Sequence, residues 1–243
     1  STLTLPSGVT LRSAVPPRFA IYGNYVFLVN TPNTPLTIDS GGTVRKLCPL
    51  PPAVAPTLAA SSGAGTLTGT YDKARYTYIV KDAAGTVIAE SDYSPASGSV
   101  AIAAKKLNIS TLGVSPDTIS ARRLYRPTTN GVILFHWFDV DGNVITAAED
   151  DLSDAGLGIV AAPSLGNPPR LTLIKEWRNR LWGVGDADID TLLYSEPDRF
   201  SAWPDSNEIT IPGTGLDRFG VRALIPRREA LGVGRRDIIW QVI

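Results

Sequence analysis

The sequence of 243 residues is short of several residue types on which common protein chemistries depend. It has one cysteine, one histidine and no methionine. The single cysteine, Cys48, excludes an internal disulfide framework and a cysteine-based zinc site. His136 would have to supply the base of any serine–histidine–aspartate triad, and an isolated histidine on a strand is more often structural. We therefore expect a protein that is not an enzyme, with Cys48 as a small residue near a linker.

Net charge and long hydrophobic runs are also lacking. The 23 lysines and arginines balance 23 aspartates and glutamates, so no overall field attracts nucleic acid or an anionic membrane. No apolar run has the length of a membrane span, and STLTLPSGV at the start has no secretory-signal pattern. The glycine-rich segment at 63–69 lacks the lysine and helix of a phosphate-binding loop. We expect no cofactor, no resident metal and no membrane span.

Helical periodicity is nearly absent, and short strand-like runs occupy most of the chain. The 22 glycines and 19 prolines are scattered between these runs and indicate many turns. Alternation is clear in RYTYIV, where Tyr76, Tyr78 and Val80 share one face. Residues 18–30 form one strand-like run, whereas 82–86 and 128–131 have the composition of hairpin turns. The pattern predicts an all-β fold.

Two proline-rich segments, at 49–57 and 163–169, are typical of linkers and divide the chain. Between them lie about seven short runs at the spacing of a β-sandwich. This block contains a tyrosine-rich strand, a hairpin and a Ser-Pro turn, and it resembles a fibronectin type III or immunoglobulin-like domain. We predict a sandwich at 55–162, inserted between β segments at 1–54 and 163–243.

The two flanking segments repeat one pattern. YGNYVFLVNTPNTPLTID and WRNRLWGVGDADIDTLLYSE share an aromatic residue, an asparagine, an apolar strand, a polar turn and a second strand. RREALGVGRRDIIWQV repeats the form in a tighter version. Three strand–turn–strand units predict propeller-like repeats, because a hairpin cannot bury its apolar face alone. The last run, DIIWQV, has no turn after it, so we expect the chain to be truncated there.

RNRLWGVGDADIDTLLYSEPDRFSAWP is similar to a blade signature of phage tail nozzle (tail tubular) proteins. LTIDSGGTVRKLCPLPP, leading into the tyrosine-rich block, and ARRLYRPTTNG resemble segments of phage tail and virion proteins. The resemblance implies a structural subunit of the virion tail, in the nozzle or head–tail connector region, assembled in the host cytoplasm. It further implies a ring of copies, a hexamer, around the DNA channel, with transient passage of DNA and contacts to other tail and portal proteins.

A carbohydrate- or receptor-binding β module of a tail fibre or secreted protein is the main alternative. Such a module would use flat aromatic rings against sugars, and the candidates are Trp177, Trp182, Tyr194, Phe200 and Trp203. In a repeated sheet the same rings fill the core between strands, which is the usual place of large aromatics. We favour packing, with Trp182 in the core and Trp203, which precedes a proline, as the candidate for exposure at an interface.

The acidic segment DVDGNVITAAEDDLSD contains the most suggestive chemical pattern. Asp139, Asp141, Asn143 and Asp150 approximate the ligand spacing of a calcium loop. However, glycine stands at the fourth position instead of the sixth, and the last ligand is aspartate in place of glutamate. Asp141-Gly142 is also a good hairpin turn, and we favour the turn over the metal site. The neighbouring pair Glu149 and Asp150 has no cleft that would indicate glycoside hydrolysis.

Arginine outnumbers lysine, and arginines are crowded near the end of the sequence. Their guanidinium groups favour contacts with phosphates in a DNA channel or with acidic neighbours. Solvated strand faces and subunit salt bridges are the simpler explanation, and the zero net charge favours subunit contacts. We predict an interface at Arg218, Arg222, Arg227, Arg228, Arg235 and Arg236.

Overall fold

The computed structural model describes residues 2–30, 33–212, 220–236 and 238–243. Within these residues the regular structure consists of strands and one short 3-10 helix, η1 (Asp154–Gly156), without an α-helix. The prediction of an all-β protein is therefore confirmed. The chain forms two compact units, unit 1 from Ser1–Cys48 and Gly166–Ile243, and unit 2 from Pro49–Leu165. Both divisions fall in or beside the proline-rich segments.

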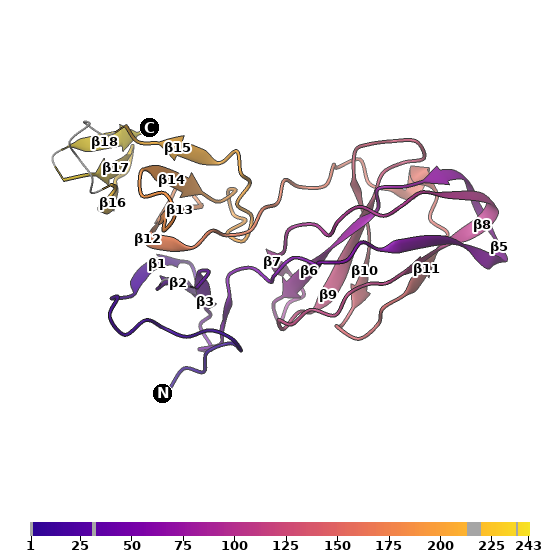
Figure 1. The fold of residues 1–243 in the computed structure, drawn as a ribbon, viewed down its shortest axis with the longest axis horizontal. Coiled ribbons are helices and arrows are strands. Elements are labelled where there is room, and N and C mark those ends of the chain that lie inside the picture. The colour runs from indigo at the N-terminus through magenta and orange to yellow at the C-terminus, as the bar shows by residue number, and fades with distance from the viewer. Residues whose placement is uncertain (1, 31–32, 213–219, 237) are drawn as a thin grey trace. The chain divides into compact units, whose positions relative to one another are not determined.

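Unit 1 contains three antiparallel sheets, each of which follows the chain strand by strand (Figure 1). Sheet 1 comprises β1 (Arg18–Tyr22), β2 (Tyr25–Val29), β3 (Leu36–Ile38) and β4 (Val44–Lys46). Sheet 2 comprises β12 (Leu171–Trp177), β13 (Arg180–Gly185), β14 (Thr191–Tyr194) and β15 (Glu208–Thr210). Sheet 3 comprises β16 (Ala223–Pro226), β17 (Leu231–Gly234) and β18 (Ile239–Val242). The three predicted strand–turn–strand units are present as the pairs β2–β3, β13–β14 and β17–β18, one in each sheet.

Each sheet of unit 1 begins with a tight hairpin. Residues 18–30 do not form the single run expected from the sequence, because Gly23 and Asn24 turn the chain between β1 and β2. Gly23 has φ +53°, a conformation that glycine adopts without steric cost. At the equivalent turn of sheet 2, Arg178 and Asn179 have φ +51° and +57°, as a type I′ turn requires. The guanidinium of Arg178 lies 4.6 Å from the centre of the Trp177 ring, a contact that favours this unusual backbone.

Sheet 2 is buried on both faces. On one face Ile174 and Leu181 pack with Phe27 and other residues of sheet 1. On the other face Trp182 packs with Leu231 and its neighbours in sheet 3. All of the residues from Leu181 to Gly185 are buried, so β13 has no polar face to solvent. This explains why its sequence is a continuous apolar run rather than an alternating one.

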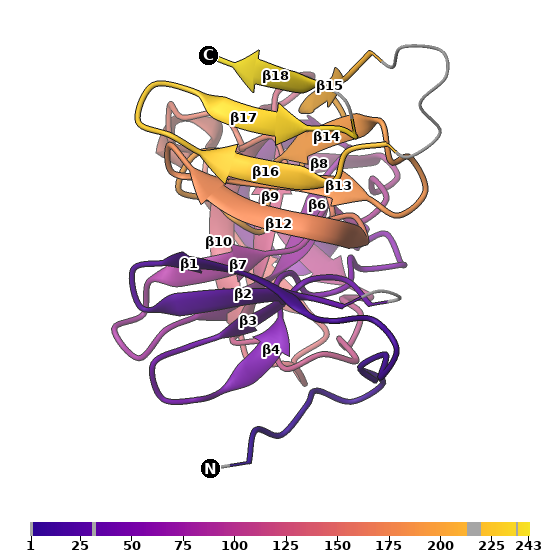
Figure 2. The same cartoon turned by 90° about the vertical axis from the view of Figure 1, so that its left-hand side faces the viewer.

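The first strands of the three sheets lie side by side. β1, β12 and β16 are edge strands of their sheets, and β12 contacts both β1 and β16. Figure 2 shows β12 between the other two. Residues that are far apart in the sequence therefore meet along this edge of unit 1.

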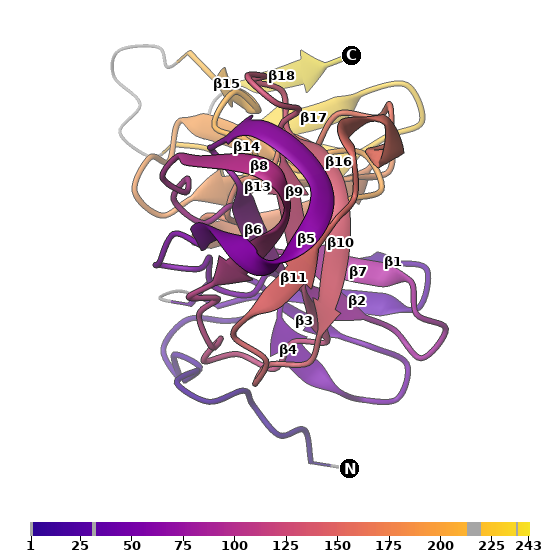
Figure 3. The ribbon, with the colours of Figure 1, turned by 90° about the vertical axis from the view of Figure 1, so that its right-hand side faces the viewer.

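Unit 2 is a seven-stranded sandwich around a separate core (Figure 3). One sheet has the order β10-β9-β6-β7 and the other β11-β8-β5. The strands are β5 (Thr57–Tyr71), β6 (Arg75–Lys81), β7 (Val87–Glu90), β8 (Val100–Ser110), β9 (Ala121–Arg126), β10 (Phe135–Asp141) and β11 (Ala148–Asp150). Tyr76, Leu107 and Trp137 are among the side chains that fill the space between the sheets. In Figure 3, β5 curls strongly along its length.

The strands of unit 2 do not all pair with their neighbours in sequence. β5 pairs with β8, whereas β6 pairs with β7 and β9. β6 therefore has partners along both of its edges. The expected sandwich is present, and its resemblance to a fibronectin type III or immunoglobulin-like domain stays a prediction.

Three serines extend the pairing of β6 beyond the end of β7. The backbone N–H groups of Ser91, Ser94 and Ser97 donate to the carbonyls of Tyr78, Tyr76 and Ala74, each at 2.9 Å. Their hydroxyls accept hydrogen bonds from the N–H groups of the same three residues, at 2.9, 3.1 and 3.0 Å. A spacing of three residues matches the repeat of a polyproline II segment, so all three serines face β6. We call this arrangement the serine ladder.

Replacing a serine of the ladder should weaken unit 2. Ser94→Ala leaves the buried N–H of Tyr76 without its acceptor, which costs about 1–3 kcal/mol. Urea unfolding should show this loss. Ser99→Ala, at an exposed serine just past the ladder, is the matched control and should be nearly neutral. Equal stability of the two variants would contradict the assigned role of the ladder.

Candidate functional site

The first strands of unit 1 border a groove with a cationic rim. Two hollows of about 200 and 340 Å³ share Arg18, Leu173 and Arg222, so they are parts of one depression. Lys175 lines the smaller hollow. Their apolar walls come from β1, β12, β16 and adjoining loops, and consist of Val15, Pro16, Phe19, Leu173, Ile174, Ile189, Val221, Ala223 and Leu224. We call this feature the cationic groove.

Each cation of the groove is placed by the edge of a different sheet. Arg18 opens β1, opposite Val29 of β2. Lys175 lies on β12 opposite the buried Trp182, and because β12 is an edge strand its side chain still reaches solvent. The backbone N–H of Arg222 donates to the carbonyl of Gly234 at 2.8 Å, which fixes this residue at the start of β16. All three side chains are exposed.

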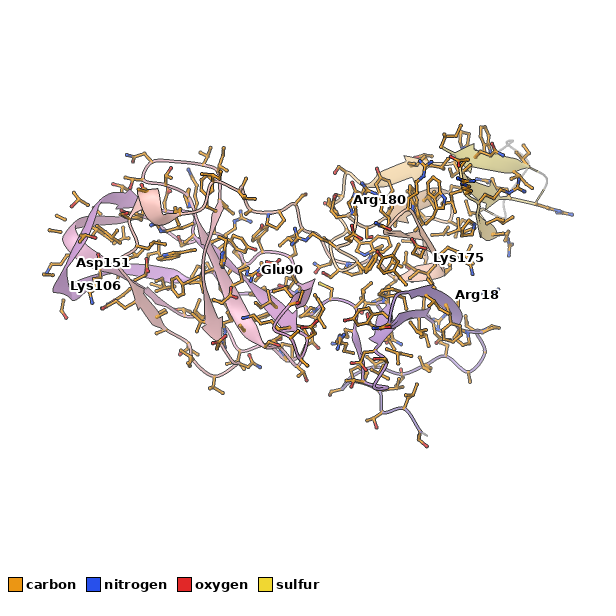
Figure 4. The ribbon with its side chains drawn as sticks, turned by 180° about the vertical axis from the view of Figure 1, so that it is seen from behind. Arg18, Glu90, Lys106, Asp151, Lys175 and Arg180 are labelled. Atoms are coloured by element: carbon orange, nitrogen blue, oxygen red, sulfur yellow. The ribbon has the colours of Figure 1, made fainter. Side chains whose placement is uncertain are left out.

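The lining of the groove is positively charged. None of the described residues that line it is acidic. Within the described part of the chain, neither Arg18 nor Lys175 has a side-chain ion pair or hydrogen bond. Figure 4 shows Arg18 and Lys175 on the same side of unit 1, with Arg180 elsewhere, donating to the carbonyl of Ser195 at 2.8 Å. Such an arrangement attracts anions.

The predicted arginine interface is not one patch. Arg222 lies at the groove, whereas Arg227 and Arg228 lie at the opposite end of the β16–β17 hairpin. Arg235 is buried, pairs with Asp190 at 2.8 Å and donates to the carbonyl of Ile211. Its guanidinium group is thus held inside unit 1. Arg236 is exposed near the Arg222 end, and Arg218 lies outside the described residues.

Sequence reasoning missed Arg18 and Lys175. They lie far apart in the sequence, and the packing of β1 against β12 brings them together.

The tryptophans of unit 1 do not form an exposed platform. Trp177 and Trp182 are buried between sheets 2 and 3, so the prediction of a core position for Trp182 is confirmed. The expected exposure of Trp203 is wrong, because its side chain is 4 % exposed and packs in the core between sheets 1 and 2. The Trp203 backbone N–H donates to the carbonyl of Gly166, where a Cβ atom would come within 2.2 Å of the Trp203 oxygen. This close approach folds the loop inward.

The residues of the predicted calcium loop have other partners. Asp139 binds Arg123 through two hydrogen bonds of 2.8 and 3.0 Å. Asn143 exchanges side-chain hydrogen bonds with the backbone of Ser115, and Asp141 is exposed near Lys81 at 3.7 Å.

At the other end of the segment, Asp150 accepts hydrogen bonds from the indole of Trp137 and the backbone of Leu152. The described residues include no group of three or more histidine, cysteine or acidic side chains placed to hold a metal ion. Gly142 has φ +75°, but the expected hairpin at Asp141-Gly142 is wrong, because β10 pairs with β9 and β11 with β8 of the other sheet.

Asp139 is the centre of an ion-pair cluster on the exposed face of unit 2. Besides Arg123 it meets Lys81 at 3.1 Å and His136 at 3.2 Å. Partial burial alone would raise its pKa, but the hydrogen bonds from His136, Arg123 and Lys81 outweigh this and hold the pKa of Asp139 well below its usual range.

Buried polar groups on the other strands of unit 2 also have structural partners. Arg122 donates to the carbonyls of Gly113, Gly142 and Asn143. Arg126 pairs with Asp154 at 2.6 Å. These guanidinium groups join loops to the sandwich.

Comparison with models of known protein families, with curated proteins and with solved structures finds no match to this chain. Among the described residues there is also no helix with the length and hydrophobicity to cross a membrane.

Asp139→Asn should lower the free energy of unfolding at pH 7 by roughly 1–3 kcal/mol, since it weakens the ion pairs with Arg123 and Lys81 and the hydrogen bond with His136. The pKa of Asp139 is depressed in the folded state, so its stabilisation is complete above the unfolded pKa of about 3.9 and declines as the pH falls below it. The difference between wild type and variant should shrink accordingly between pH 5 and pH 2, measured by urea unfolding. Asp92→Asn, a partly exposed aspartate of the same unit, serves as the control. A difference independent of pH would contradict this assignment.

Proposed function

We propose that this chain is a structural, non-enzymatic subunit of a bacteriophage tail, in the nozzle or head–tail connector region. In this function copies of the chain form a ring around the DNA channel and contact neighbouring tail proteins. The observation that carries the proposal is the stack of three sheets built on one repeated hairpin, in which sheet 2 is covered on both faces by its neighbours.

The stack supports the proposal because the same kind of contact, an aromatic side chain of one sheet against the next sheet, occurs twice. Phe27 of sheet 1 faces sheet 2, and Trp182, at the equivalent place of sheet 2, faces sheet 3. The first strands adjoin, as the inner strands of neighbouring propeller blades do. A propeller closes with typically about four to eight blades, and unit 1 supplies three sheets of this kind.

Both outer faces of the stack are apolar and accessible. On sheet 1, Phe19 and Ile21 are 44 % and 68 % exposed. On sheet 3, Ile225 and Ile239 are 39 % and 62 % exposed and flank Gly232. Two different apolar faces at opposite ends of a stack favour head-to-tail contacts between copies, and such contacts close into rings when the rotation permits.

Unit 2 fits the role of a docking module for neighbouring proteins. Val132, Ile159 and Val160 are 73 %, 98 % and 77 % exposed. The bridge between Phe135 and Ala161 brings their two loops together. Exposed aliphatic side chains that gather in this way are typical of interaction surfaces.

The alternative of a carbohydrate- or receptor-binding module is less well supported. Trp177, Trp182 and Trp203 are buried, and the other two candidate rings, Tyr194 and Phe200, are partly buried against the same cores.

Electron microscopy of the purified chain, and of the virions that contain it, tests the proposal. We expect closed rings of identical copies, with hexamers as the predicted order. Ile21→Asp places a charge on the outer face of sheet 1 and should shift the rings to monomers while the circular dichroism spectrum stays unchanged. Val144→Asp, at an 82 % exposed position of unit 2, is the control and should leave the rings intact. A wild-type protein that stays monomeric and is absent from virions would overturn the proposal.

A further inference from the structure

We propose that the cationic groove binds the phosphodiester backbone of DNA and is the side of unit 1 that meets it. The phosphate chemistry is argued from the groove alone. The choice of DNA as the natural source of that phosphate rests on the proposed function.

The first argument is the distribution of charge. The chain as a whole is neutral, so an attraction for anions has to come from local segregation. Elsewhere in unit 1, Arg235 is neutralised by Asp190. Arg18 and Lys175, by contrast, have no carboxylate among their described neighbours, and Arg222 adds a third positive charge to the same lining. Three cations supplied by three strands converge on one depression, where phosphate oxygens can accept from each of them.

The second argument is the shape of the groove. The two hollows share Arg18, Leu173 and Arg222, so the depression continues past the position of a single ion. An elongated groove with cations along it suits a linear polyanion better than a free phosphate ion.

The third argument concerns which part of DNA the groove can contact. Its lining contains no asparagine, glutamine or carboxylate that would read a base edge. Arginine and lysine over an apolar floor contact the backbone and carry no sequence information. Binding should therefore be independent of sequence, weak and sensitive to salt.

The magnitude of this salt dependence follows from the number of cations. Each phosphate neutralised on duplex DNA contributes about −0.9 to the slope of log K against log salt concentration. With up to three contacts we expect a slope of roughly −2 to −3 for the wild-type protein. Weak binding of this kind is compatible with a wall along which DNA moves.

Fluorescence anisotropy with labelled double-stranded DNA tests the inference. The double variant Arg18→Ala/Lys175→Ala should lose about tenfold or more in affinity at low salt, and its salt slope should fall by about 2. Arg227→Ala/Arg228→Ala is the matched control, because it removes the same charge from an exposed position at the far end of the β16–β17 hairpin. The control should bind DNA like the wild type.

Competitors distinguish the sources of the anion. Two DNA sequences of equal length should compete equally, and inorganic phosphate should compete only at much higher concentration. Equal losses in the two double variants would overturn the inference, because binding would then follow net charge alone. Displacement by an acidic peptide but not by unlabelled DNA would overturn it as well, in favour of a protein ligand.

The DNA-binding experiment and the ring-assembly experiment can fail independently. If rings form but the protein does not bind DNA, DNA binding by the cationic groove is refuted and the ring proposal is unaffected. If the protein forms no rings but binds DNA through Arg18 and Lys175, the ring proposal is refuted and DNA binding by the groove is supported. Arg18→Gln/Lys175→Gln keeps the length and polarity of the side chains, and retention of the wild-type circular dichroism spectrum shows that a loss of affinity is not a loss of folding.

Discussion

The burial of both faces of sheet 2 is the constraint on which the rest of unit 1 depends. Leu181 must fit against sheet 1 while the adjacent Trp182 fits against sheet 3. At Gly183 a Cβ atom would come within 2.6 Å of Leu171, so even a methyl group has no room. A change anywhere in β13 therefore disturbs two interfaces at once, and the three sheets have to be understood as one packed body.

Because the faces of sheet 2 are buried, its charged side chains can reach solvent only at the edges and turns. The turns and the first strands are the parts of unit 1 that can present charge to solvent, and Arg18, Lys175 and Arg222 all lie along one such edge. Most other charges in the chain have partners close by, as Asp139 does in unit 2 and Arg235 does in unit 1. At the groove, Arg18 and Lys175 have no such partner among the described residues.

Local features of the sequence predicted local features of the structure. The glycine, asparagine and aromatic residues of the repeats indicated the hairpins, and the apolar run around Trp182 indicated its burial. Contacts between distant residues were beyond such reasoning. Trp203 is buried because of Gly166, and Arg235 because of Asp190, and neither partner is marked by its neighbours in sequence. The strand order of unit 2 likewise depends on both edges of β6 being occupied.

The serine ladder gives the edge of β6 a dynamic property that an ordinary strand pair lacks. The amide protons of Ala74, Tyr76 and Tyr78 are held by hydroxyl groups, whose acceptor is set by a single side-chain torsion, and not by carbonyls fixed in a neighbouring backbone. Rotation of one serine can release one of these protons while the strands stay in place. Hydrogen exchange at these three amides therefore reports serine rotamer changes, and not only the opening of the sheet.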